Sequence, residues 1–469
     1  MRTRSLALLL SLSLFACGDE TGDPPIGGSN EGGAAAGGEA NGGAGPVIGG
    51  GGGGLGGAGG SEIGGGGSGG QGGSGGAGPG CPVDWVVGIG EQVGTATYHS
   101  AKLPGGDVIV GGESSPFADF YDNTGYYAQP LLVRLSPSGQ EIWRVSLPAS
   151  NEAWLRGLVT GADGTIFIAG QFKGTLTFGA TTLSAPSQDL FVAALDADGM
   201  PLWIKQFGDA QIQTLTDMAI DANGELVIGG TLFGSVDFGG GALTATTAPD
   251  LYLARLTASG DHIASRVISN GQTDWLTSLD VTPDGRVLIG AEYADVATQG
   301  QLVEAYSPDL TTRLWQTATD EITPQVRALP NGSAVVVGTF LGMHTLDATG
   351  AVTSSASQDS GSYGIAPIAV AVTSDGLVCV TGSASAPLDL GTGPLVPDSV
   401  SNSVIGCYDA SWTPQFALLF QGGASAIGRF LPLGPGAGLV AGNFNGFDLC
   451  GSTVVVAGDR DGVAARLSY

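Results

Sequence analysis

The three histidines could support acid–base chemistry or metal binding, and they are His99, His262 and His344. They lie in distant parts of the chain, and the sequence holds neither a His-x-x-x-His nor a Cys-x-x-Cys spacing, so it contains no metal-site motif. A Gly-x-Ser-x-Gly motif between a strand and a helix, typical of many hydrolases, is also absent. Catalytic groups can be assembled from distant segments, so a hydrolytic site built by the fold stays open. The motifs favour a protein that is not an enzyme.

The charged residues are mostly acidic. Sixteen basic residues stand against 43 acidic ones, giving a formal charge of −27, and no Lys/Arg cluster follows the first few residues. Nucleic acid is therefore excluded as a partner, because it is bound through basic side chains that neutralise phosphates. The acidity favours solubility, and no cofactor is predicted. Scattered loop carboxylates that hold Ca²⁺ are the alternative, although no EF-hand spacing is present.

Four cysteines follow the first 80 residues, an even number that permits disulfides in an exported chain. They allow three pairings. We favour Cys379 with Cys407, inside one repeat unit, and Cys81 with Cys450, near the two ends of the folded region. Two buried free thiols at 379 and 407 are the alternative.

One segment between expected strands is rich in aromatic residues set among carboxylates and an amide, as is common where proteins bind sugars or peptides. It contains Phe117, Phe120, Tyr121, Tyr126 and Tyr127. We consider it a possible ligand loop, with an ordinary insertion at a blade edge as the alternative.

The N-terminus reads as an export signal. Two arginines precede an apolar run over residues 5–16 that is too short to cross a bilayer, which needs about 20 residues. The sequence Leu14-Phe15-Ala16-Cys17 resembles the bacterial lipobox, which implies a lipoprotein signal peptide over 1–16 and lipidation of Cys17. Gly18, in place of Asp, favours the outer membrane. The alternative is an ordinary signal peptide that ends in a free cysteine.

Residues 17–80 form a glycine-rich stretch without apolar periodicity, so we expect a disordered tether. A glycine-rich coil of this length has a root-mean-square span of roughly 45 Å. Such a tether would let a folded domain over 81–469 stand off the membrane.

The region from residue 81 repeats a segment that begins with Gly and ends in Gly or Ala. In five of the seven copies, Asp or Asn precedes the first Gly, and this pair favours a tight hairpin turn. Each copy therefore predicts a buried strand leaving a hairpin. The copies are 106–112, 164–170, 224–230, 285–291, 332–338, 376–382 and 436–442.

These copies recur every 44 to 61 residues, which fits four-stranded propeller blades. We therefore predict an all-β, seven-bladed β-propeller over 81–469, with six or eight blades as alternatives, and expect a monomer. The segment 461–467 matches the third strand of a unit, while 85–90 matches a fourth strand that has no unit of its own. The N-terminal strand is thus expected to complete the last blade. Trp85, Trp143, Trp203 and Trp315 recur at blade ends, where wide rings would fill the gap between blades.

The segments 217–241 and 250–256 resemble the bacterial SBBP-type β-propeller repeat of secreted proteins and lipoproteins, notably in myxobacteria. This resemblance implies the fold and export but no single activity. The segments that end at Trp143 and Trp203 also resemble quinoprotein propeller repeats over a short stretch, which would imply eight blades and a quinone-dependent dehydrogenase.

The expected function is a binding or scaffold module for a protein or carbohydrate at the cell envelope, held to the membrane by its lipid. The alternative is an envelope hydrolase or lyase with its active site in the central channel. The sequence names neither ligand nor substrate, because a fold does not determine them.

Overall fold

The computed structural model describes residues 83–89, 95–114, 128–246, 249–269, 273–293, 300–319, 321–338, 341–357, 365–397, 402–421, 426–444, 447–449, 452–454 and 461–469. The segment 1–80, Cys81, Cys450 and the aromatic loop lie outside the described residues. The described part of the chain contains β-strands and no α-helix, and hence no helix that could span a bilayer.

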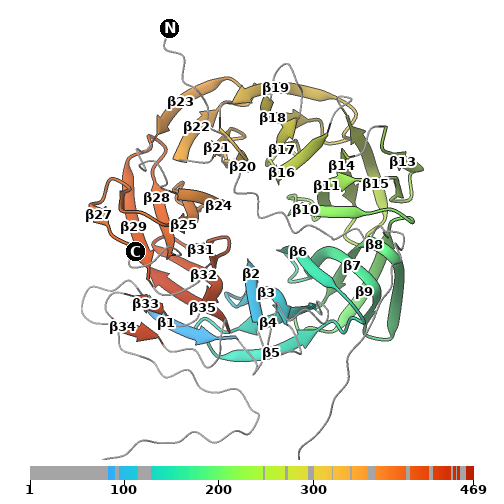
Figure 1. Ribbon diagram of the computed structural model, residues 1–469, viewed down its shortest axis with the longest axis horizontal. Coiled ribbons are helices and arrows are strands. Elements are labelled where there is room, and N and C mark those ends of the chain that lie inside the picture. The colour runs from blue at the N-terminus through green and yellow to red at the C-terminus, as the bar shows by residue number, and fades with distance from the viewer. Residues whose placement is uncertain are drawn as a thin grey trace, which may run out of the picture. The chain divides into compact units, whose positions relative to one another are not determined.

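Seven β-sheets are arranged in a ring, as Figure 1 shows, which confirms the predicted seven-bladed β-propeller. We number the blades along the chain from β2. From the axis outward, blade 1 consists of β2 (Thr95–Lys102), β3 (Val108–Ser114), β4 (Gln129–Leu135) and β5 (Glu141–Ser146), blade 2 of β6 (Ala153–Thr160), β7 (Ile166–Phe178), β8 (Thr181–Leu195) and β9 (Pro201–Phe207), and blade 3 of β10 (Gln213–Ile220), β11 (Leu226–Leu232), β14 (Asp250–Leu256) and β15 (His262–Ile268). In the same order, blade 4 consists of β16 (Asp274–Val281), β17 (Val287–Tyr293), β18 (Gly300–Tyr306) and β19 (Arg313–Thr319), blade 5 of β20 (Gln325–Ala328), β21 (Ala334–Val337), β22 (Gly342–Leu346) and β23 (Val352–Ser357), and blade 6 of β24 (Ile365–Val372), β25 (Val378–Ala384), β28 (Asn402–Tyr408) and β29 (Pro414–Phe420). Blade 7 begins at the axis with β30 (Ala426–Ile427) and β31 (Leu431–Gly434), followed by β32 (Ala437–Phe444), β35 (Asp461–Ser468) and β1 (Val83–Gly88).

The repeated segment supplies the second strand of each blade. In the turn before β7, the amide of Thr165 donates to Asp163 Oδ1 at 3.0 Å, and Gly164 has a φ of 88°, which glycine adopts without strain. The strand that follows is buried over Ile166–Phe172, with neighbouring blades on both faces. The Asp-Gly pair therefore sets the hairpin, and the apolar run sets the core strand.

The ends of the chain close the ring. β1 pairs antiparallel with β35, and Val87 lies opposite Ala464. This pairing confirms the prediction that the N-terminal strand completes the last blade, and it leaves β35 without an open edge.

Tryptophans tie neighbouring blades together at their outer strands. The Nε1 of Trp143 in blade 1 donates to the carbonyl of Ala197 in blade 2 at 3.0 Å, and Trp203 in blade 2 donates to Ala258 in blade 3 at 3.1 Å. Trp85 and Trp315 make the same bond to the turn of the following blade, as expected from their recurrence.

Some blades carry a small extra hairpin between their second and third strands. It is formed by the ends of β7 and β8 in blade 2, by β12 (Ser235–Asp237) with β13 (Ala242–Thr244) in blade 3, by β26 (Leu388–Asp389) with β27 (Pro394–Leu395) in blade 6, and by β33 (Phe447–Leu449) with β34 (Ser452–Val454) in blade 7. In blade 5, β21 ends at Val337 and β22 begins at Gly342, and the described residues between them form no such hairpin.

Candidate functional site: the ring axis

The innermost strand of each blade lies along the axis of the ring (Figure 1). Most side chains on these strands are apolar or small. The exceptions are ionisable groups from several blades, and they converge near the axis.

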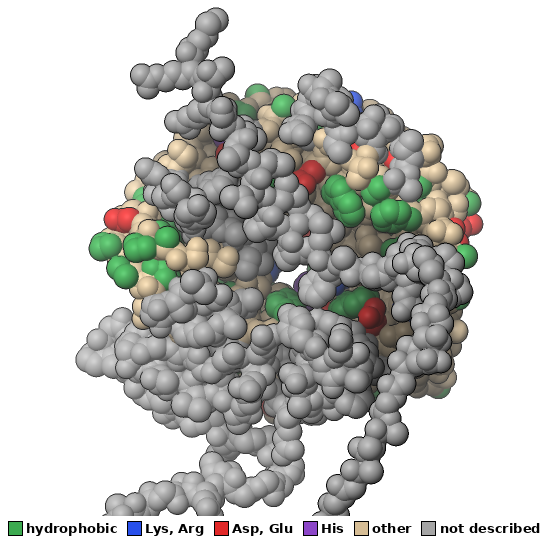
Figure 2. All heavy atoms as spheres, in the orientation of Figure 1, with side chains coloured by type: hydrophobic (Ala, Val, Ile, Leu, Met, Phe, Trp, Pro, Cys, Tyr) green, Lys and Arg blue, Asp and Glu red, His purple; other side chains and the backbone are tan. Residues whose placement is uncertain are grey.

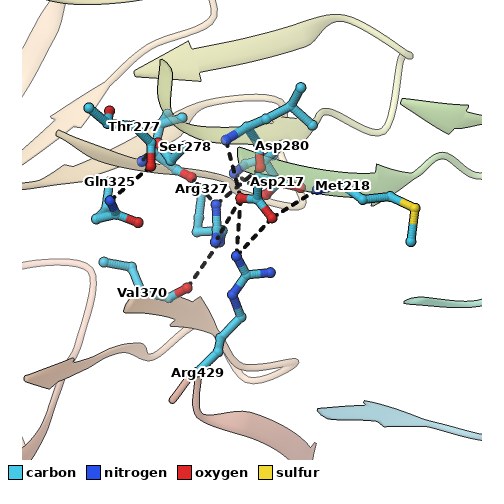
Figure 3. Close-up of polar contacts among 12 residues, drawn as sticks. Asp217, Met218, Thr277, Ser278, Asp280, Gln325, Arg327, Val370 and Arg429 are labelled. Carbon is cyan, nitrogen blue, oxygen red and sulfur yellow. Dashed lines mark hydrogen bonds and ion pairs between the residues drawn. The ribbon is translucent and has the colours of Figure 1, made fainter. Parts of the chain in front are cut away.

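Asp217 of β10 is the centre of this cluster (Figure 3). Arg429 Nη2 donates to both carboxylate oxygens of Asp217, at 3.0 and 3.1 Å, and Arg327 Nη2 lies 3.4 Å from Oδ2. The three residues belong to blades 3, 7 and 5, which are not neighbours in the ring. Contacts between them therefore place their side chains near the axis, where they link blades that share no sheet interface.

Arg327 is held by backbone carbonyls as well as by the carboxylate (Figure 3). Its Nε donates to Val370 O at 3.0 Å, and its Nη1 donates to Leu279 O at 3.1 Å and to Val326 O at 2.7 Å. These bonds reach blades 4 and 6. The buried guanidinium is thus satisfied by four consecutive blades, counting its contact with Asp217 in blade 3.

Burial and neighbouring charge oppose each other in this cluster. Burial would raise the pKa of Asp217, but the guanidiniums of Arg429 and Arg327 hold that pKa below its usual value. Burial, and then repulsion by Arg429, lower the pKa of Arg327. For Asp280 of β16, burial prevails and raises the pKa. Asp217 is consequently ionised and forms ion pairs with both arginines.

A second group lies beside this cluster, on blades 1 and 2. His99 Nε2 donates to Leu155 O at 3.2 Å, the Leu155 amide donates to Glu113 Oε1 at 3.0 Å, and Arg156 Nη1 lies 3.9 Å from the same oxygen. Burial, with repulsion by Arg429 and Arg156, lowers the pKa of His99 to about 4. Burial raises the pKa of Glu113 to about 7 although Arg156 opposes the shift. In the view down the ring, histidine atoms are visible at the edge of the central opening (Figure 2).

Two cavities open where the innermost strands turn outward. One, of about 680 Å³, lies over the turns of blades 1 to 3 and is lined by Asp163 and Asn223; the other, of about 570 Å³, is lined by turn residues of blades 4 to 7 such as Thr373. Lys102, at the end of β2, lines both. We call this end of the channel the turn-side mouth. It offers polar turn groups and aliphatic walls to a ligand.

The residues predicted from the sequence are distributed as follows. Cys379 and Cys407 lie opposite each other on β25 and β28 and form a disulfide, with their Cα atoms 4.1 Å apart. The three histidines occupy different blades and do not meet. Cys17, Cys81, Cys450 and the aromatic loop are outside the described residues. Among the residues that the structure describes, no group of three or more His, Cys, Asp or Glu side chains could hold a metal ion.

The axial cluster was not foreseen from the sequence. Asp217 is separated from Arg327 by 110 positions and from Arg429 by 212, and no motif connects them. The available signal was a charged residue at a first-strand position where blades 2, 4 and 6 carry Gly157, Ser278 and Ala369.

Comparisons with known proteins assign neither a family nor a role to this chain. No family model and no curated protein match this chain. Among solved structures, YCF48 bound to D1 peptide matches at 11% identity and a TM-score of 0.47, over 84% of this chain and 97% of that one. A streptogramin B lyase matches at 11% and 0.46, over 82% and 98%, and a protein of unknown function from Bacteroides caccae at 11% and 0.38, over 62% and 89%. At these identities no role carries over to this chain.

Proposed function

We propose that this chain is an exported binding module, anchored to the cell envelope through a lipid on Cys17, whose propeller takes a protein or carbohydrate ligand at the turn-side mouth. The outer membrane is the proposed location. The lipid anchor rests on the sequence, and the binding role rests on the geometry of the ring.

The two cavities at the turn-side mouth are the observation that carries the binding role. Each of them, at about 680 and 570 Å³, has a size in the range of ligand sites, and Lys102 lines both. The turns around them present side chains and backbone groups from every blade. Ligands of propellers and other scaffolds are commonly held by such loops on a rigid frame.

The charge state of the axial groups favours binding over hydrolysis in the channel. A general acid or base works best with a pKa near the working pH. Asp217 is ionised and paired with two arginines, and His99, with a pKa near 4, is a weak base at neutral pH. Glu113 has a suitable pKa, but one of its oxygens accepts the Leu155 amide in a buried site.

Binding can be tested with glycan and peptide arrays, followed by affinity measurements on variants. Ala222→Trp and Ser374→Trp fill the two cavities, and both positions are exposed turn residues. Met200→Trp, at an exposed position outside both cavities, is the matched control. A ligand of the turn-side mouth should lose at least tenfold in affinity with one or both cavity variants and keep its affinity for the control. A ligand that binds all three variants equally would exclude this site.

A further inference from the structure

In the described part of the chain, the groove between the outer parts of blades 4 and 5 lacks the cover that an extra hairpin gives to blades 2 and 3. In blade 3 the extra hairpin packs on the outer strand of the preceding blade, with the rings of Phe238 and Phe207 5.0 Å apart. In blade 2 the hairpin bonds to the chain after β5, where Thr177 N donates to Pro148 O at 2.8 Å. The described residues of blade 5 form no such hairpin, so none of them covers the equivalent groove beside β19.

A cavity of about 250 Å³ occupies this groove. Apolar side chains form most of its wall, and four polar residues line the rest. The apolar ones are Val303, Ala318, Val336, Leu346 and Val352, and the polar ones are Thr317, Thr319, His344 and Ser355. The cavity therefore suits a small ligand that has an apolar part and a polar part.

His344 lies between a hydroxyl and a carboxylate at the edge of this cavity. Ser355, its cross-strand partner on β23, places Oγ 2.9 Å from Nδ1, and Glu321 places Oε1 3.2 Å from Nε2. A carboxylate only accepts, so Nε2 carries the hydrogen and Nδ1 can accept from Ser355. Ser355 is exposed, whereas the Glu321 side chain is 12% exposed.

Glycines make room for Glu321. A Cβ on Gly342 would lie 1.6 Å from Glu321 Oε1, and one on Gly338 would lie 2.2 Å from the Glu321 Cβ. Any larger residue at either position would displace the carboxylate from His344. The two glycines thus allow the Glu321 carboxylate to lie beside the His344 imidazole.

The other hydroxyl–imidazole pair in the described structure lacks this arrangement. His262 Nε2 lies 3.0 Å from Ser265 Oγ, and the imidazole packs against Gly240. In the described part of the chain, His344 has a carboxylate among its hydrogen-bond partners, whereas His99 and His262 have none. The two pairs therefore differ in the group that would orient the base.

From this geometry we propose that Ser355, His344 and Glu321 form a nucleophilic site that hydrolyses esters of short acyl chains, independently of the binding role proposed above. Ser355 Oγ attacks the ester carbonyl while His344 Nδ1 takes its proton, and the imidazolium then gives that proton to the departing alcohol. Water next attacks the acyl-serine, His344 takes the proton of that water, and the carboxylic acid leaves as Ser355 regains its hydrogen. Glu321 is a positioning residue that holds the imidazole tautomer.

In this proposal Thr319, which lines the same cavity as Ser355, donates to the developing oxyanion. Its hydroxyl oxygen accepts the Glu321 amide at 3.1 Å, which leaves the hydroxyl hydrogen available for donation at the cavity wall. A donor aimed at the developing charge is worth about a hundredfold or more in rate in known hydrolases. Thr319→Val keeps the shape and removes that donor.

The test uses the full chain with p-nitrophenyl butyrate and a fluorophosphonate probe. We expect butyrate hydrolysis faster than palmitate hydrolysis, and phosphonylation of Ser355 found by peptide mass mapping. Ser355→Ala should abolish the label and lower the rate at least tenfold, whereas Ser265→Ala should change neither. Since a lone imidazole also cleaves activated esters, the label on Ser355 is the deciding measurement.

Glu321→Gln tests the positioning role separately from folding. It should lower the rate and shift the pH at half-maximal rate downward, because an imidazole without its carboxylate binds its proton less tightly. An unlabelled Ser355 in the native chain, or a Ser355→Ala variant as active as the native chain, would overturn the proposal. Ligand binding at the turn-side mouth would be unaffected by either result.

Discussion

The ion pairs of the buried Asp217 connect blades that share no sheet interface, so their loss should lower the stability of the whole ring. Removing one member of a buried pair leaves the other charge uncompensated and typically costs about 3–5 kcal/mol. Asp217→Asn keeps the size of the side chain but cannot neutralise Arg327. We expect it to lower the free energy of unfolding by about 3 kcal/mol in urea denaturation.

The matched control for Asp217 is Asp198→Asn. Asp198 also lies near an arginine, 3.5 Å from Arg134, but its side chain is 88% exposed. Exposed pairs contribute about 0–1 kcal/mol. Equal effects of the two substitutions would show that the axial cluster does not hold the blades together.

Glu113 makes stability depend on pH in a defined direction. Its pKa in the folded chain, about 7, lies above the ordinary value of 4.5, so the folded state keeps the proton longer. The corresponding stability is complete below pH 4.5, falls as the pH rises from 4.5 to 7, and stays lost above that.

Glu113→Gln should remove this loss. Native and variant chains should be about equally stable at pH 4, and the variant should be more stable at pH 8 by up to about 3 kcal/mol, since a tenfold change in proton affinity is worth about 1.4 kcal/mol. Urea denaturation at the two pH values measures this difference. A variant that is less stable at pH 8 would show that Glu113 is stabilising in its ionised form.

At the scale of the element, glycines in the outer turns leave room for the tryptophan rings of the preceding blade to pack against the turn. Gly260 has a φ of 75°, and a Cβ there would lie 2.8 Å from the ring of Trp203. Gly224, in the same blade, has a φ of 82° and open space around it. Substitutions at Gly224 and Gly260 therefore distinguish the cost of backbone strain, present at both, from the cost of crowding, present only at Gly260.

Gly224→Ala should cost about 1 kcal/mol of stability, the usual cost of a left-handed conformation for a residue with a Cβ. Gly260→Ala should cost more, because Trp203 must also move. Denaturation of the two variants side by side measures the difference, and tryptophan fluorescence should change only in Gly260→Ala. Equal costs would mean that Trp203 shifts freely and contributes little to the contact between blades 2 and 3.

The elements were predictable where local chemistry decides them. Asp163-Gly164 sets a turn and the apolar run after it sets a strand, so each blade could be located from its own residues. The axial cluster and the Ser355–His344–Glu321 site could not be located, because side chains from separate blades or separate strands assemble them only after folding. The loss of the extra hairpin in blade 5 was visible as a shorter repeat, but its consequence, an open groove, depends on what the hairpin covers in other blades.

At the scale of the whole molecule, ring closure depends on β1. A chain lacking residues 1–89 should expose the edge of β35 and form aggregates or dimers, since an unpaired strand edge recruits other chains. A chain lacking only residues 1–80 should remain monomeric and as stable as the full chain. Size-exclusion chromatography and thermal denaturation distinguish these outcomes. A monomeric, equally stable 90–469 chain would show that the last blade does not need its fourth strand.

The position of β1 also has a mechanical consequence. The chain before Val83 joins the ring through this strand, which is attached to blade 7 by its hydrogen bonds with β35 and to blade 1 by the bond from Trp85 to Pro137. Any pull on the N-terminal segment, for example between a membrane anchor and a captured ligand, would load these bonds first. The strand that completes blade 7 therefore bears the load first, while the inner strands of blade 7 keep their own bonds to blade 1, such as that from Thr97 to the carbonyl of Gly442.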